Sequence, residues 1–246
     1  MNFETDVKES IQRTGDIISI RFTRPAEFDY SPGQFIFVTV GSGDNEVTKH
    51  LSISSSPTEG FLEVTKRLTG HPFANALAAL KEGDKVRLRG PFGKFTLAGE
   101  AGGHKKIGML SGGIGISPLR SMIKYACDKM LDTDIVLFYS NRHEESIAFE
   151  KEFEDLARKF PKFNVANTVT MPGPSWKGIT GRISADMIKK YMPDYLDRVF
   201  YVSGPTRMVD SMLTLLKEMN IPEEQIKKEF FQDTIEFVDR GEIRAA

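Results

Sequence analysis

The chain has 246 residues, a formal net charge of −1 and a single cysteine, Cys127. This length accommodates one large domain or two modest ones, and the near-zero charge argues against a nucleic acid or an anionic membrane surface as partner. One cysteine excludes an internal disulfide and a cysteine-ligated iron–sulfur cluster within this sequence, and we expect Cys127 to be a buried apolar residue.

The first six residues show neither the basic start nor the apolar stretch of a secretion signal. No apolar run along the chain approaches the length of a membrane-spanning helix. We therefore expect a reduced protein of the cytoplasm, without a membrane span.

The first hundred residues are typical of antiparallel β-structure. Short β-branched or alternating segments, separated by turn residues, predict strands at 17–22, 35–40, 51–54, 61–65 and 86–89. A six-stranded barrel closes such a sheet economically. One helix is expected at 72–80, with Pro72 in its first turn and Gly83-Asp84 after its end.

After residue 104 the pattern changes to strands that alternate with amphipathic helices. The expected strands are 107–110, 135–139, 164–170 and 199–203, and the expected helices are 119–130, 147–159, 185–190 and 207–219. This alternation favours a parallel sheet covered on both faces. Ligands of such sheets bind beyond the carboxyl ends of the strands.

The fold class expected is therefore two-domain, an antiparallel β-barrel followed by an α/β domain with a parallel sheet. We place the barrel domain at 1–99, the α/β domain at 104–231 and a polar tail at 232–246. The small residues at 98–104 are typical of a linker between the two domains.

The most informative single motif is a glycine-rich turn at 110–119, Leu-Ser-Gly-Gly-Ile-Gly-Ile-Ser-Pro-Leu, between an expected strand and an expected helix. Backbone N–H groups at such a turn, with the positive end of the helix, bind a pyrophosphate. The glycine spacing differs from the standard dinucleotide fingerprint. Taken alone, the motif also fits an ordinary tight turn.

Further motifs, in order along the chain, resemble the ferredoxin–NADP reductase family of flavoenzymes over roughly residues 5–231. Taken singly each motif is weak, but their common order is improbable by accident. They are Pro-Gly-Gln-Phe at 32–35, Lys-His-Leu-Ser-Ile-Ser-Ser-Ser-Pro at 49–57, the segment 77–84, Gly-Pro-Phe-Gly at 90–93, the glycine turn, Tyr-Ser-Asn-Arg at 139–142, the segment 176–182 and Ser-Gly-Pro-x-x-Met at 203–208.

The resemblance implies an FAD site on the barrel, where an Arg-x-Tyr-Ser strand of the family matches Lys49, His50, Leu51 and Ser52. Lys49 keeps the positive charge without the arginine fork, and Leu51 offers apolar cover without an aromatic stack. The Ser52 hydroxyl is expected near flavin N5, and His50 is either a flavin contact or a surface histidine.

Other flavin contacts are expected from the next strand and from the helix start that grips the pyrophosphate in the family. The matching residues are Val64, Thr65, Lys66, Pro72, Phe73 and Ala74. Ala74 stands where the family usually has Ser or Thr, so one hydroxyl contact is lost. Because the pyrophosphate segment is still recognisable, FAD is favoured over FMN.

The resemblance also implies a nicotinamide site. The phosphates are expected at Gly112, Gly113, Ile114, Gly115, Ser117 and Pro118. Ser140 and Arg142 are expected at the adenosine ribose, where an arginine fork suits a 2′-phosphate, although Glu144 and Glu145 follow closely. NADPH is therefore favoured over NADH, while Arg142 also fits a solvated loop charge.

Around the nicotinamide ring, Ser203, Gly204 and Pro205 match the Cys-Gly-Pro of relatives, and Met208 is expected to pack nearby. Glu229 and Phe231 match a Glu-x-aromatic ending in which the aromatic ring shields the flavin. Phe237, in the tail, is an alternative for that shield. We expect Ser52, Ser203 and Glu229 to act in catalysis, with no metal site.

The function implied is hydride transfer between NAD(P)H and FAD, with electrons passed to a carrier such as ferredoxin, flavodoxin or a cytochrome, or to an oxygenase component. One alternative is a flavoprotein subunit that works with a separate iron–sulfur partner. Another is a non-catalytic nucleotide-binding module, because Lys49, Leu51, Ala74 and Ser203 all depart from the family pattern.

Overall fold

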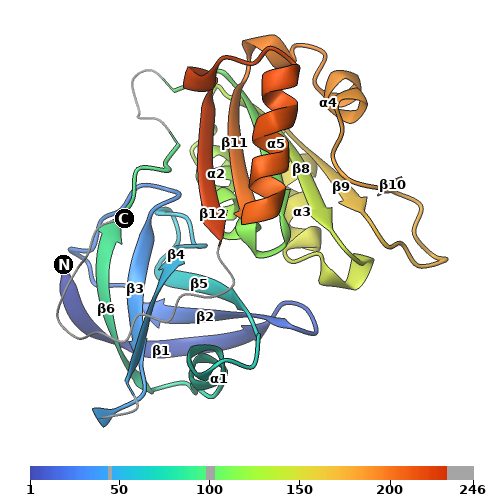
Figure 1. The fold of residues 1–246 in the computed structure, drawn as a ribbon. Coiled ribbons are helices and arrows are strands. Elements are labelled where there is room, and N and C mark those ends of the chain that lie inside the picture. Colours follow the sequence, from blue (N-terminus) through green and yellow to red (C-terminus); the bar gives the residue numbers. More distant parts are fainter. Residues whose placement is uncertain (44–45, 98–102, 232–246) are drawn as a thin grey trace.

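The computed structural model describes residues 1–43, 46–97 and 103–231, which form two packed bodies (Figure 1). The first is an antiparallel β-barrel, and the second is an α/β unit with a parallel sheet. The expected two-domain fold class is therefore confirmed. Most of the expected linker at 98–104 and the whole tail at 232–246, with Phe237, lie outside the described residues.

The barrel is one sheet whose strands pair antiparallel in the order β4-β3-β6-β1-β2-β5. Its edge strands meet where Ile53 bridges to Val64, which closes the sheet at that end. Helix α1, Pro72–Ala78, packs Phe73 and Leu77 into the barrel core. The strands are β1 Asn2–Gln12, β2 Ile17–Thr23, β3 Phe35–Val40, β4 Val47–Ser52, β5 Phe61–Arg67 and β6 Lys85–Phe92.

Two strands of the barrel differ from the expectation. β1 was not expected, yet it pairs with both β2 and β6. Its apolar residues Phe3, Val7 and Ile11 recur only every fourth position, so no period of two is visible. The strand expected at 51–54 begins earlier and ends earlier, as β4. This edge strand is partly exposed, and its polar residues at 48–50 hid its start from the sequence analysis.

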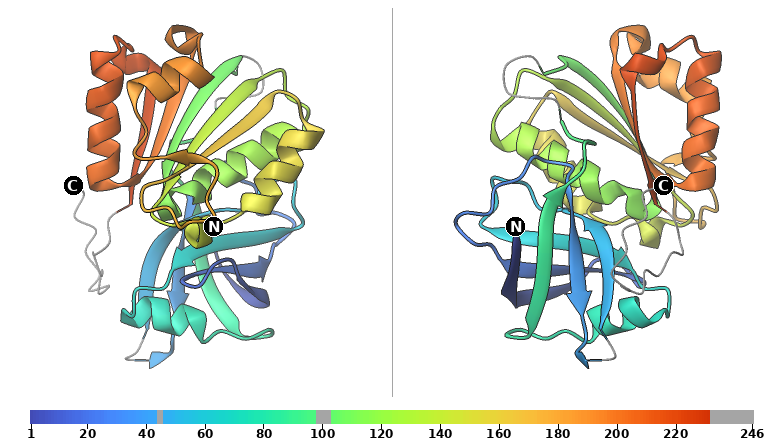
Figure 2. Two further views of the ribbon diagram at one scale, coloured as in Figure 1. Left: turned by 90° about the vertical axis from the view of Figure 1, so that its right-hand side faces the viewer. Right: turned by 60° about the vertical axis from the view of Figure 1, so that its left-hand side comes forward.

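The second sheet is entirely parallel, in the order β10-β9-β8-β7-β11-β12. Helices α2 and α3 cover one face and helices α4 and α5 cover the other (Figure 2). The strands are β7 Lys106–Gly112, β8 Asp134–Asn141, β9 Phe163–Val169, β10 Ile179–Thr180, β11 Val199–Pro205 and β12 Ile226–Phe231; the helices are α2 Ile116–Asp128, α3 Glu150–Lys159, α4 Ala185–Tyr191 and α5 Thr206–Glu218.

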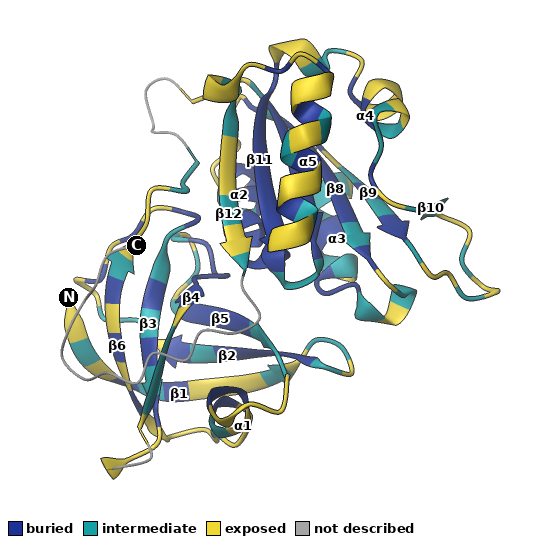
Figure 3. Cartoon of the chain, in the orientation of Figure 1, coloured by how far each residue is buried: buried dark blue, intermediate teal, exposed yellow. Residues whose placement is uncertain are grey.

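Burial differs sharply between the centre and the edge of this sheet. β11 is buried along most of its length, whereas α5 turns an exposed face outward (Figure 3). The edge strands β10 and β12 were not expected, because β10 has two residues and β12 reads Ile-Lys-Lys-Glu-Phe-Phe with little apolar signal. Among the helices described, none is long and apolar enough to cross a membrane.

The strand order positions the site. From β7 the chain builds outward through β8 and β9, and it then returns to the other side of β7 with β11. A crevice opens beyond the strand ends at such a switch point. The carboxyl ends of β7 and β11 therefore frame the expected ligand site, and they point toward the barrel (Figure 1).

On β5, Glu63 is a fully buried carboxylate on the face opposite the barrel core residues Leu62 and Val64. It accepts hydrogen bonds from Arg13 at 2.8 Å, Arg21 at 2.9 Å and the Ser54 hydroxyl at 3.0 Å. A buried charge is tolerated only when it is paired and hydrogen-bonded. These contacts therefore hold together the turn after β1, strand β2, the beginning of β5 and the segment after β4.

Replacing Glu63 by Ala leaves two arginines without their shared buried carboxylate, and we expect a loss of about 3 kcal/mol in the free energy of unfolding. Urea denaturation measures it. The matched control is Glu9→Ala, which removes only the exposed partner of Arg21 and should cost less than about 1 kcal/mol. Equal losses in the two variants would contradict the role given to burial.

Candidate active site

Four neighbouring strands carry a row of side chains across the parallel sheet. Tyr139 of β8, Ser111 of β7, Ser203 of β11 and Glu229 of β12 are successive register partners. Register partners project from the same face of a sheet, and Tyr139 lies in the core beneath α2 and α3. The row therefore lies on the α2 side and ends, at Glu229, beside the barrel.

The barrel meets this row at Ser52, the last residue of β4. Its Oγ donates a hydrogen bond to Glu229 Oε2 at 3.4 Å. Burial raises the pKa of the Glu229 carboxyl to about 7, and the hydrogen bond from Ser52 opposes part of that rise. The structure thus brings together Ser52, Ser203 and Glu229, which the sequence analysis assigned to catalysis.

Two hydroxyls in the row are buried without a partner. The Oγ atoms of Ser111 and Ser203 make no hydrogen bond to any described residue. Because buried polar atoms are nearly always paired, two orphaned hydroxyls fit a site that a ligand completes. The sequence analysis singled out Ser203 but not Ser111, whose only signal is its position directly before the glycine turn.

The glycine turn at 113–115 joins β7 directly to α2. Gly113 has a φ of +52°, a region that favours glycine. A Cβ on Gly115 would lie 2.4 Å from the carbonyl oxygen of Ser203, so the turn packs against the end of β11. Gly115 also precedes α2 without supplying a capping side chain. The N–H of Ile116 already donates to the carbonyls of Gly113 and Ile114, and Pro118 has no N–H, so the first turn of α2 offers an anion fewer backbone donors than a regular helix start.

The residues that flank the turn have packing roles. The Ser117 hydroxyl donates to the Ile114 carbonyl at 3.0 Å, so it is already engaged, and Pro118 is buried in the first turn of α2. The Met208 sulfur would lie 3.0 Å from a Cβ on Gly204. The exposed residue at the end of β11 is Pro205, and its register partner on β12 is Phe231.

The alternation of β4 divides the expected flavin residues between two faces. Leu51 lies in the barrel core, 8% exposed, and Lys49 is on the same face two residues earlier. His50 lies on the opposite face, with its ring 5.5 Å from that of Phe35. The structure therefore brings Lys49 and Leu51 together but separates His50 from them.

Most of the residues expected on β5 and α1 have buried side chains, and Val64 and Phe73 belong to the barrel core. Buried among them are Val64, Thr65, Phe73 and Ala74. The Thr65 hydroxyl is also engaged, at 2.8 Å from two serine hydroxyls. Only the backbone of these four can meet a cofactor, whereas Lys66 is partly exposed and Pro72 is exposed.

Beyond β8 lies a groove of about 500 Å³ lined by His143, Glu144, Glu145, Met171, Pro172 and Gly173. Ser140, near the end of β8, and the exposed Arg142 directly precede the lining residue His143 in the sequence. The Glu144 carboxylate accepts hydrogen bonds from the N–H of Gly173 at 3.0 Å and the hydroxyl of Ser175 at 3.1 Å. The bond from Gly173 is the main cause that lowers the pKa of Glu144.

One cation beside the glycine turn escaped the sequence analysis. Arg67, at the end of β5, has its Nη2 atom 3.6 Å from the place of a Cβ on Gly113. Its Nε pairs with Asp16 at 3.1 Å. The barrel thus brings a positive charge to the turn of the other domain. The available signal was its place directly after Lys66.

Two family models match the two halves of the chain. A model described as an oxidoreductase FAD-binding domain matches residues 3–97, and one described as an oxidoreductase NAD-binding domain matches residues 109–213. The ferredoxin–NADP reductase of Neisseria gonorrhoeae, solved with bound FAD and NADP, superposes with a TM-score of 0.79 over 93% of this chain and 98% of its own length at 19% identity, which shows the shared fold.

The glycine betaine monooxygenase reductase subunit of Chromohalobacter salexigens is 30% identical over 91% of this chain, and the chain spans 62% of that relative's length. NADH-cytochrome b5 reductase 1 of Dictyostelium discoideum is 30% identical over 84% of this chain and 74% of its own length. The fold, the paired domains and these relatives lead to one conclusion: the chain belongs to the ferredoxin–NADP reductase family of FAD- and NAD(P)-binding oxidoreductases.

Proposed function

We propose that this chain is a reductase that transfers hydride between NADPH and FAD and passes electrons on to a separate carrier. The contact that supports the proposal is the 3.4 Å hydrogen bond between Ser52, at the end of the strand matched to the flavin, and Glu229, at the nucleotide edge. FAD supplies the hydride-accepting atom, and the protein supplies binding, orientation and electrostatics.

In this proposal the two domains contribute different groups. Ser52 presents a hydrogen-bond donor at the flavin N5 position, while the Leu51 side chain packs in the barrel core and supports the strand from its other face. Ser203 supports the nicotinamide ring. Glu229, with a pKa of about 7, holds or releases a proton near neutral pH beside both groups. Hydride transfer itself requires no acid–base pair from the protein.

The preference for NADPH rests on the end of β8. Arg142 is exposed and makes no ion pair within the described ranges, so its guanidinium is available to a 2′-phosphate. The neighbouring Glu144 carboxylate is engaged by Gly173 and Ser175. These hydrogen bonds fix the direction of the carboxylate and favour its charged form, so the preference for NADPH requires Arg142 to outweigh the acidic residues at this groove.

The proposed partner is a ferredoxin, a flavodoxin, a cytochrome or an oxygenase component. Two relatives carry names that support this class, since one is the reductase subunit of a monooxygenase and the other is a reductase of cytochrome b5. The cytoplasmic location stays a prediction.

Replacing Ser52 by Ala removes one hydrogen bond beside the flavin. We expect reduction of bound FAD by NADPH to slow about tenfold, the equivalent of about 1.4 kcal/mol, with FAD content unchanged. Anaerobic stopped-flow loss of the visible flavin absorbance measures it. The matched control is Ser211→Ala, which removes an exposed hydroxyl on α5 that bonds to the Arg207 carbonyl. An unchanged rate in Ser52→Ala would contradict the role.

Replacing Arg142 by Ala removes the proposed phosphate fork. We expect kcat/KM for NADPH to fall about ten- to hundredfold, because a charge-assisted hydrogen bond contributes about 1.5–3 kcal/mol. The value for NADH should change little. The control Arg87→Ala removes an arginine that pairs with Glu46 on the barrel and should leave the NADPH to NADH ratio as it is. A parallel fall for both nucleotides would refute the assignment.

The raised pKa of Glu229 makes stability depend on pH. The unfolded chain ionises this carboxyl near pH 4.5, whereas the folded chain keeps the proton until about pH 7. The free energy of unfolding should therefore fall as pH rises through this interval. Denaturation of wild type and Glu229→Gln across the interval isolates the effect, which the Gln variant lacks. Ser52→Ala should extend the interval to higher pH, because it removes the hydrogen bond that lowers the pKa of Glu229. Identical pH profiles of stability in wild type and Glu229→Gln would contradict the raised pKa.

A further inference from the structure

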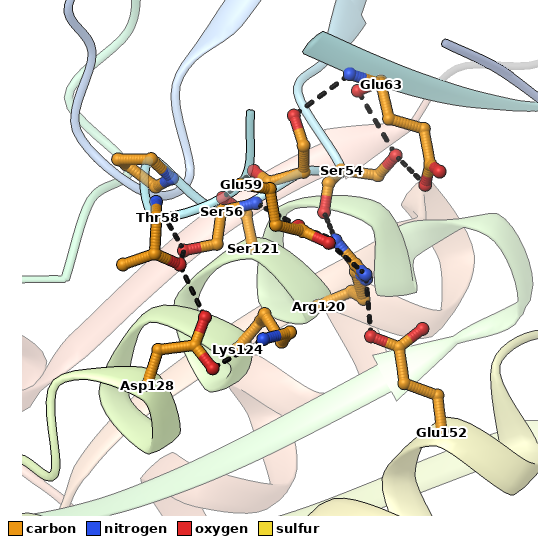
Figure 4. Close-up of polar contacts among 12 residues, drawn as sticks. Ser54, Ser56, Thr58, Glu59, Glu63, Arg120, Ser121, Lys124, Asp128 and Glu152 are labelled. Atoms are coloured by element: carbon orange, nitrogen blue, oxygen red, sulfur yellow. Dashed lines mark hydrogen bonds and ion pairs between the residues drawn. The ribbon is translucent and has the colours of Figure 1, made fainter. Parts of the chain in front are cut away.

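Arg120 of α2 is a buried arginine that joins three segments of the fold. It is 2% exposed. Its guanidinium donates to the Ser54 carbonyl at 2.9 Å and to Glu59 Oε1 at 3.0 Å, and it pairs with Glu152 of α3 at 2.6 Å (Figure 4). Ser54 and Glu59 belong to the barrel, so this one side chain ties the two domains together.

The contact continues along α2. The hydroxyl of Ser121 donates to the Ser55 carbonyl at 2.5 Å. Further along the helix, Asp128 accepts a hydrogen bond from Thr58 at 2.5 Å (Figure 4). Together with Arg120, these residues form the α2 clamp, which holds the segment that follows β4 against one helix of the α/β domain.

The α2 clamp joins the two segments that the proposed reaction must align. Ser54 is two residues beyond Ser52, in the segment matched to the flavin. Arg120 is about one helical turn beyond Ile116, where α2 begins after the glycine turn. At the other end of this interface, the polar contact is the long hydrogen bond between Ser52 and Glu229. If a nicotinamide ring enters between Ser52 and Glu229, the α2 clamp must keep the two domains in place so that the ring stays aligned with the flavin.

The chemistry of the clamp requires an arginine. The planar fork satisfies a backbone carbonyl and two carboxylates in fixed directions, which the point charge of a lysine does not do. Glu59 is itself oriented, because it accepts from the N–H of Ser56 at 2.7 Å. The ring of Phe149 lies 5.6 Å from the guanidinium carbon of Arg120. The side chain is therefore held from several directions.

We propose that Arg120 is a positioning residue that sets the distance between nicotinamide and flavin, through the barrel segment it holds. The inference rests on the proposed hydride transfer. A misplacement of the reacting atoms by about 1 Å costs up to about hundredfold in rate. Loosening the clamp should therefore slow the chemical step and leave the binding of each cofactor unchanged.

The test uses the FAD-loaded full chain and compares Arg120→Lys and Ser121→Ala with wild type. We expect the limiting rate of flavin reduction at saturating NADPH to fall about tenfold or more in Arg120→Lys and less in Ser121→Ala. FAD content and the Kd of NADP should stay within about twofold, a change of less than about 0.5 kcal/mol. With NADPH deuterated at the transferred position of C4, the kinetic isotope effect should become more dependent on temperature.

The control Arg158→Ala breaks an exposed ion pair with Asp155 on α3 and should behave as wild type. If Arg120→Lys does not fold, Ser121→Ala and Glu152→Gln carry the test, since each removes one contact only. Variants that lose thermal stability but keep the rate and the isotope effect overturn the inference alone. A FAD-loaded wild type that neither NADPH nor NADH reduces overturns the proposed function and, with it, this inference.

Discussion

Hydride passes only between atoms in contact, so cofactors bound to two domains depend on an interface that holds the domains edge to edge. Here close contacts link the two domains. A Cβ on Gly33 of the barrel would lie 2.4 Å from the Met122 side chain of α2, and Ile17 of β2 lies in the same core as α2. The hydroxyl of Tyr201 adds a hydrogen bond to the Thr96 carbonyl at 3.0 Å. The barrel therefore contributes Ile17 to the core of the α/β domain, and the end of β12 meets the end of β4 at the hydrogen bond between Ser52 and Glu229.

The sequence predicted those parts of the architecture in which apolar residues recur with a clear helical or strand period. The alternation of strands and helices after residue 104 predicted the parallel sheet, because buried parallel strands are continuous apolar runs that are easy to recognise. The glycine turn indicated the edge of that sheet where a ligand binds. The edge strands β4 and β12 and the interior strand β1 were missed or shifted, since their exposed faces carry charged residues that hide a period of two. Arg67 and Ser111 lie next to motifs that the sequence analysis identified, but their roles were missed because those roles come from contacts between segments that are distant in the sequence.

The departures from the family motif have a common physical pattern. Lys49, Leu51 and Ser203 keep the charge, the apolar surface or the size of the residues they replace, and they lose directional contacts. At Ala74 the side chain is buried in the barrel core, where only the backbone remains for a cofactor. The side chains at these four positions therefore offer fewer directional contacts than the family pattern does. Such a site depends more on the relative placement of the two domains, so the contacts between the domains matter more for the alignment of the cofactors.

The central claim is that the two cofactor sites share one reaction space at Ser52, Ser203 and Glu229. Anaerobic titration of the FAD-loaded protein with NADPH and, separately, with NADH tests it most directly. The account predicts that the visible absorbance of the flavin is lost in proportion to added NADPH, with one nucleotide oxidised for each flavin reduced. A protein that binds FAD and NADPH together while its flavin stays oxidised would contradict the account.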